Sequence, residues 1–199
     1  MSRTNSKIEK RNSFAGFIVE QREDSSKLII AGTPIVYDTP TPLFKINGKQ
    51  YYEIIARGAI ARADTSDVIF NIEHAGRVYA RTRNSSLQLR DTEHGLEAIV
   101  ELDSNDQGHR ELYNDIKAGR LDRMSFSFTA ADSSFDEEAC TITINRIEKL
   151  YDVSAVAFPA YDDTTISARC ADLLGEHRNQ QQGENRSNER EFAIALTLL

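Results

Sequence analysis

Short apolar runs, rather than long helical repeats, dominate this chain. Most are rich in β-branched or aromatic residues and end at glycine, proline or polar turn residues, which is the pattern of β-strands. Residues 108–118 are the exception, because Leu112 and Ile116 fall on one helical face and Gly119 follows as a stop. The sequence therefore predicts a mainly β protein with a few helices, built as a β-barrel or a strongly curved antiparallel sheet. The expected strands cover residues 14–19, 27–37, 68–72, 78–82, 87–89, 95–102, 122–129, 140–147 and 152–158, with a proline-containing loop at residues 39–42.

The polarity of the chain changes near both ends. Residues 1–12 are polar and aperiodic, which predicts a flexible leader before a folded domain of residues 13–173. Residues 174–199 form a tether: its long middle part, residues 175–191, contains no apolar side chain that could pack in a core. The last eight residues are mostly apolar. They fit either a docking peptide or a short element that folds back on the domain.

Charge and composition exclude several classes of protein. The 199 residues include 24 Lys+Arg and 31 Asp+Glu, a net charge of −7, which argues against a basic nucleic-acid-binding surface. No apolar run reaches the length of about 18 residues that a membrane span needs. Cys140 and Cys170 are too few for a disulfide framework or a metal quartet, so we expect a soluble protein from a reducing compartment. Phosphate-loop, HExxH, CxxC and GxSxG motifs are missing, and we expect neither a cofactor nor a metal.

Among four histidines, His74 is the best candidate for a general base. It directly follows the apolar segment of residues 68–72, so it should lie at a strand end near the interior. His94 lies in a turn and should be exposed, His109 opens the expected helix, and His177 lies in the tether. A purely structural histidine at position 74 remains an open alternative.

One strand has an unusual arrangement of hydroxyl groups. In residues 121–128, Met124, Phe126 and Phe128 alternate with Ser125 and Ser127, which places the two serines on the opposite face. A rigidly anchored strand can hold a nucleophilic serine in place, and its Oγ must stay within hydrogen-bond distance of a base. The alternative is an ordinary amphipathic strand with a solvated serine face.

Asp152 lies within an apolar segment, between Tyr151 and Val153. An unpaired buried carboxylate is costly, so Asp152 needs a partner. His74 is one candidate partner. Arg146, Arg123 or backbone donors are the others, and the sequence does not choose among them.

Several motifs occur in a fixed order across residues 14–168: FAG at 14–16, EIIARGA at 53–59, IEH at 72–74, ART at 80–82, IKAG at 116–119, RMSFSF at 123–128, LYDVS at 150–154 and FPAY at 158–161. In order and spacing they resemble the prohead (procapsid maturation) serine proteases of tailed double-stranded DNA phages, a family with a herpesvirus assemblin-like fold. By this resemblance His74 matches the catalytic histidine and Ser125 the nucleophile. Asp152 stands where the family usually has the glutamate of an E-V-S motif, one methylene longer.

The resemblance implies a serine endopeptidase that acts during virion assembly. Such an enzyme would process the major capsid protein with its scaffolding region inside the immature capsid, or prohead, in the host cytoplasm. It would also cleave itself. The net charge and the lack of a long apolar run predict neither nucleic acid nor membrane as a partner. The first alternative is a catalytically inactive, capsid-associated structural protein of the same fold. A second is a hydrolase of small esters or amides, which should have a deep apolar pocket rather than an open strand edge.

Overall fold

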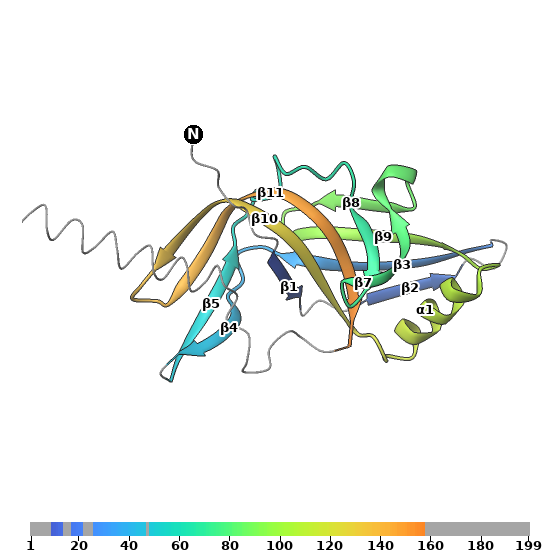
Figure 1. The fold of residues 1–199 in the computed structure, drawn as a ribbon, viewed down its shortest axis with the longest axis horizontal. Coiled ribbons are helices and arrows are strands. Elements are labelled where there is room, and N and C mark those ends of the chain that lie inside the picture. The colour runs from blue at the N-terminus through green and yellow to red at the C-terminus, as the bar shows by residue number, and fades with distance from the viewer. Residues whose placement is uncertain (1–8, 14–16, 22–25, 47, 158–199) are drawn as a thin grey trace, which may run out of the picture. The chain divides into compact units, whose positions relative to one another are not determined.

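A computed structural model describes residues 9–13, 17–21, 26–46 and 48–157 (Figure 1). The chain divides into two compact units, Met1–Asp163 and Thr164–Leu199. The second unit lies wholly outside the described residues, as do the predicted tether, His177, Cys170 and the last residue of the strand expected at 152–158. The description that follows concerns the first unit.

A seven-stranded sheet is organised around β11, a strand of 16 residues. Along one edge β11 is antiparallel to β10, with which it forms the long curved pair in Figure 1. Along its other edge it pairs in parallel with β5 near its start and with β6 near its end. The strands of this sheet are β1 (Glu9–Ser13), β4 (Thr41–Ile46), β5 (Lys49–Ile55), β6 (Ile69–Ile72), β7 (Ala75–Arg81), β10 (Arg123–Asp136) and β11 (Thr141–Val156).

A four-stranded antiparallel sheet has the order β2-β3-β9-β8. Its strands are β2 (Phe17–Gln21), β3 (Lys27–Val36), β8 (Leu87–Asp91) and β9 (Gly95–Asp103), and a 3-10 turn, η1 (Thr82–Asn84), precedes β8. Helix α1 (Gln107–Lys117) packs against β2, β3 and β9 through Leu112, Tyr113 and Ile116, all buried. Asp106 caps its first turn, because its side chain accepts a hydrogen bond from the His109 N–H.

The predicted fold class is confirmed, because the described residues are mostly strands and the sheets are curved but not closed into a barrel. Residues 141–147 and 152–156, from two predicted strands, belong to the single strand β11. Its register with β10 shifts at several places, which accommodates extra residues without ending the strand. The loop expected at 39–42 is shorter than predicted, since β4 begins at Thr41. Proline is tolerated there because β4 is an edge strand.

The predicted leader overlaps a strand. Residues 9–12 of the predicted 1–12 belong to β1, which pairs antiparallel with β10. The residue pattern does not predict this strand, because main-chain hydrogen bonds to a sheet edge require no apolar periodicity. The domain boundary at residue 173 stays a prediction.

Ile147 is expected to be a stability determinant. Its side chain is 0% exposed on β11, so Ile147→Ala leaves a cavity and should lower the free energy of unfolding by about 2–5 kcal/mol. Urea unfolding followed by circular dichroism measures this loss. Ile18→Ala is the matched control, because Ile18 is 71% exposed and its truncation should change stability by less than about 0.5 kcal/mol. Equal effects of the two substitutions would contradict the described packing.

Candidate active site

Two neighbouring strands present four polar side chains on one face of the sheet. On β10 the alternation predicted from the sequence is present: Met124 and Phe128 are fully buried on one face, and Ser125 and Ser127 point to the other. The register of β10 against β11 sets Ser125 opposite Ser154 and Ser127 opposite Asp152. The two serines of β10 are each 1% exposed, so this face is not solvated. The strand pair therefore holds three hydroxyls and one carboxylate together in a buried patch.

His74 reaches this patch from the hairpin between β6 and β7. Ile72 faces Ala75 across the hairpin, so Glu73 and His74 form a two-residue loop. Both have positive φ, 52° and 56°, which is the signature of a type I′ turn and normally favours Asn-Gly. Conformations of this kind cost on the order of 1–3 kcal/mol per non-glycine residue and persist only where the surroundings enforce them.

Contacts with the end of β11 enforce this turn. The Glu73 N–H donates to the Ala155 carbonyl at 3.0 Å, and the Glu73 side chain accepts a hydrogen bond from the Ala157 N–H at 2.8 Å. β6 itself pairs in parallel with β11, with Asn71 opposite Ser154. The hairpin is thus fastened on the strand that carries Asp152, and the imidazole of His74 lies over the polar patch.

The imidazole bridges the patch. His74 Nε2 lies 2.5 Å from Ser125 Oγ, and His74 Nδ1 lies 2.6 Å from Asp152 Oδ1. Ser127 Oγ and Ser154 Oγ lie 3.0 and 3.2 Å from the same Nδ1. The structure therefore brings together the three residues that the sequence singles out, and His74, not Arg146 or Arg123, is the partner of Asp152. Arg146 instead pairs in register with Asp132 on an exposed part of the sheet.

Hydrogen bonds keep the Asp152 carboxyl ionised. Burial by itself raises its pKa, but hydrogen bonds from His74, Ser127 and Ser154 and the charge interaction with His74 outweigh burial and lower the pKa below its usual value. The Ser154 hydroxyl lies 2.8 Å from Asp152 Oδ1 and also contacts the side-chain oxygen of Asn71, so these two acceptors share its one proton. Asp152 is thus a fixed acceptor for the Nδ1 proton of His74.

Sequence reasoning missed the supporting residues Glu73, Asn71 and Ser154. Glu73-His74 contains no glycine, so no ordinary turn signal marks it. Asn71 lies in an otherwise apolar strand, where a buried amide was a possible signal that it had polar partners. The other two described histidines lie elsewhere: the His94 side chain is 85% exposed, and His109 Nδ1 accepts a hydrogen bond from the Asp103 N–H.

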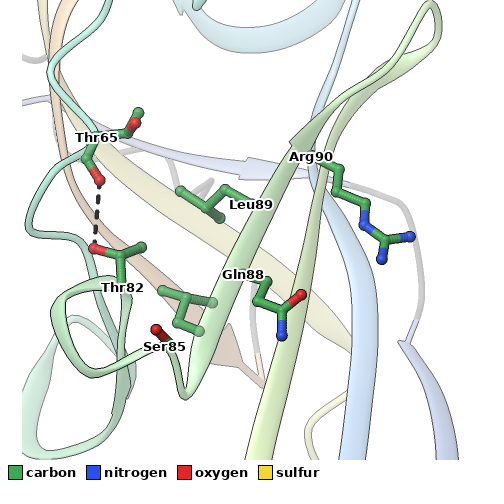
Figure 2. A pocket seen from close by; sticks show the side chains of 7 residues that line it. Thr65, Thr82, Ser85, Gln88, Leu89 and Arg90 are labelled. Carbon is green, nitrogen blue, oxygen red and sulfur yellow. Dashed lines mark hydrogen bonds between the residues drawn. The ribbon is translucent and has the colours of Figure 1, made fainter.

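A pocket near η1 lies apart from these residues. It is lined mainly by polar side chains, including Thr65, Thr82 and Gln88, and none of His74, Ser125 and Asp152 takes part (Figure 2). Thr82 Oγ1 donates to the Thr65 carbonyl at 3.3 Å across it. This pocket lacks the apolar lining that a hydrolase of small esters should have. Among the described residues, no group of three or more His, Cys, Asp or Glu could hold a metal ion, and no helix is long and apolar enough to cross a membrane.

The largely buried His74 imidazole has a hydroxyl at one nitrogen and a carboxylate at the other, an arrangement that can activate a serine hydroxyl. Comparison with known proteins identifies the family of this chain. Residues 16–178 match the model of the caudovirus prohead serine protease family. The chain therefore belongs to that family, which is a family of peptidases, and the resemblance seen in the sequence is confirmed.

Two known proteins are similar to this chain, one in sequence and one in fold. The prohead protease of Escherichia phage T5 is 32% identical over 92 residues, which are 46% of this chain and 42% of the T5 protein. The chain thus matches less than half the length of that relative. The solved structure of the bacteriophage T4 capsid assembly protease, gp21, superimposes with a TM-score of 0.50 at 11% identity, covering 78% of this chain and 100% of the other. At this identity the second match shows a shared fold.

The lowered pKa of Asp152 predicts a pH-dependent contribution to stability. A carboxyl whose pKa falls on folding stabilises the folded state above its unfolded pKa of about 3.9 and loses that contribution as the pH falls through the lower folded value. The free energy of unfolding of the wild type, minus that of Asp152→Asn, should therefore decrease from about pH 5 downward. Urea titrations of both proteins at several pH values measure it. A difference that does not change with pH would contradict the assigned hydrogen bonds.

Proposed function

We propose that this chain is a serine endopeptidase of phage prohead maturation, with Ser125 as nucleophile, His74 as general base and acid, and Asp152 as the group that orients His74. The observation that carries this assignment is the pair of short contacts from one imidazole, at 2.5 Å to Ser125 Oγ and 2.6 Å to Asp152 Oδ1. The membership in a peptidase family supports it.

The first half of the proposed reaction acylates Ser125. Its Oγ attacks the carbonyl carbon of the scissile peptide bond while His74 Nε2 takes the hydroxyl proton. Asp152 accepts a hydrogen bond from the Nδ1–H of His74 and stabilises the imidazolium that forms. When the tetrahedral intermediate collapses, the C–N bond breaks, the proton on Nε2 passes to the leaving amine, and the acyl group stays on Ser125 as an ester.

The second half restores the enzyme with water. His74 Nε2 takes a proton from a water molecule, whose oxygen attacks the ester carbon of the acylated Ser125. Collapse of this intermediate breaks the ester bond, releases the new carboxyl end, and returns the proton to Ser125 Oγ. No cofactor enters either half.

The names of the relatives support the choice of substrate. One is a prohead protease and the other a capsid assembly protease. We infer that this chain cleaves the major capsid protein in its scaffolding region, inside the immature capsid in the host cytoplasm. We also propose that it cleaves itself in the polar tether, between residues 175 and 191, which lies outside the described residues.

The competing function is a structural protein of the same fold without catalysis. A fluorophosphonate probe separates the two, because only a serine with an assembled general base reacts rapidly with it. Labelling of the wild type at Ser125, and none of His74→Ala, is the result expected for the protease.

Ser125→Ala should abolish processing of the capsid protein and self-cleavage, lowering turnover by at least about 10⁴-fold while the fold persists. The measurement is co-expression with the cognate major capsid protein, followed by mass spectrometry of both chains in the assembled shells. Ser134→Ala is the matched control, since Ser134 lies on the same strand but is exposed. Cleavage by purified Ser125→Ala would refute the nucleophile assignment and make Ser127 the next candidate.

His74→Ala should be about as damaging as the loss of Ser125, because members of such a triad act as a unit. His94→Ala should leave activity within about twofold of the wild type, since the His94 side chain is 85% exposed and bonded only to its neighbour Glu93 among the described residues. The rate of cleavage of the capsid protein by each purified variant decides this. An active His74→Ala together with an inactive His94→Ala would overturn the assignment.

Asp152→Asn should lower turnover by about 10⁴-fold, because an amide favours the wrong tautomer of His74. Asp152→Glu restores the residue that the family usually has and should retain much more activity. The measurement is specific activity per folded molecule, with circular dichroism to count the folded fraction. If Asp152→Asn cleaves at the rate of the wild type, the enzyme works with a dyad of Ser125 and His74.

A further inference from the structure

The strand that carries Ser125 has its outer edge covered by the chain's own N-terminal region. β1 pairs antiparallel with β10 over five residues, from Glu9 opposite Phe128 to Ser13 opposite Met124. In this register Asn12 lies directly opposite Ser125. Residues that face each other in such a ladder have Cα atoms about 4.5–5.5 Å apart, so the backbone of β1 lies beside the nucleophile. Figure 1 shows β1 as a short strand next to β10.

A peptide substrate needs this same region. To be cleaved, an extended chain must bring a carbonyl carbon to Ser125 Oγ and be held there by contacts that do not depend on its sequence. The main-chain groups along a strand edge supply such contacts, as in other cases of β-strand addition. β1 pairs with β10 along residues 124–128, so this part of the edge has no place for a second strand while β1 is bound.

We propose that the outer edge of β10 is the docking site for the extended peptide substrate and that β1 is its internal occupant, so that substrate binds only when β1 leaves. The proposal rests on the proposed protease function. It also fixes the direction of the substrate: an incoming peptide runs antiparallel to β10, so residues before the one opposite Ser125 lie along positions 126–128 and those after it along 123–124.

The composition of β1 suits an occupant that can leave. Its sequence, Glu-Lys-Arg-Asn-Ser, contains no apolar or β-branched residue. A strand of this kind gains little from apolar burial, so its pairing depends on main-chain hydrogen bonds that an incoming peptide can replace one for one. The next strand inward is different: β10 places Met124 and Phe128 in the core and cannot exchange.

A binding experiment tests the inference without relying on catalysis. Two proteins are compared, the full chain and a chain that lacks residues 1–13, and both carry Ser125→Ala. The probe is a fluorescein-labelled peptide with the sequence of residues 8–14, read by fluorescence polarisation. We expect at least about tenfold tighter binding to the shortened chain, because the competing strand is gone. The same peptide with alternate amide nitrogens methylated is the control and should not bind, since it cannot complete the ladder.

Proline substitutions in the full chain, again with Ser125→Ala, test the same proposal without truncation, so the test does not depend on whether the shortened chain folds. Successive residues of an antiparallel strand direct their N–H groups to opposite sides, so one of Lys10 and Arg11 donates to β10 and the other points outward. Of Lys10→Pro and Arg11→Pro, one should therefore raise peptide affinity as truncation does, and the other should behave as the wild-type sequence. Equal affinity of the full, shortened and proline-substituted chains for the peptide would overturn the proposal.

Cleavage assays on the same chains with Ser125 restored separate this proposal from the protease function. The shortened chain should cleave a peptide from the capsid scaffolding region with at least about tenfold higher kcat/KM than the full chain. If the shortened chain binds the peptide more tightly yet no chain cleaves, the proposed protease function is wrong and the proposed docking site on β10 is supported. If both chains cleave equally well and bind the peptide with equal affinity, the protease function is supported and the proposed docking site on β10 is wrong.

Discussion

The register between β10 and β11 is the constraint on which the site depends. It sets Ser125 beside Ser154 and Ser127 beside Asp152, all on one buried face, and the imidazole of His74 then spans the patch diagonally from Ser125 to Asp152. A slip of one residue would turn every side chain of one strand to the other face. Because Met124 and Phe128 are fully buried on the opposite face, the apolar core itself prevents that slip.

The second constraint is the strained turn that carries His74. Two consecutive residues with positive φ, neither of them glycine, lower the stability of the hairpin taken alone, and the bonds of Glu73 to the end of β11 offset that cost. Backbone strain of this kind is found at functional sites because it fixes a side chain in one place. The turn places His74 within hydrogen-bond distance of Ser125, 51 positions later in the chain, and of Asp152, 78 positions later.

The hydroxyl groups around Asp152 explain how a short buried carboxylate is held in contact with His74. Asp152 Oδ1 lies 2.6 Å from His74 Nδ1, because β11 pairs with β6, the strand that leads into the turn. Ser127 and Ser154 then act as donors that hold the carboxylate ionised against the cost of burial. In this arrangement the precision of the site comes from the strand pair and the two serines more than from the length of the acidic side chain.

Local residue patterns predicted the helix, most strands and the candidate groups, but they did not predict β1, β4 or β5. Alternation in residues 121–128, the apolar strand before His74, and the acid within an apolar segment are local patterns, so β10, β6 and the three site residues could be named in advance. The partner of Asp152 follows from the three-dimensional fold, because it depends on the parallel pairing of β6 with β11. The fold also decided that residues 9–13 form a strand on β10. Main-chain hydrogen bonds to a sheet edge leave no mark in the residue pattern, and long-range pairing is fixed by packing rather than by local preference.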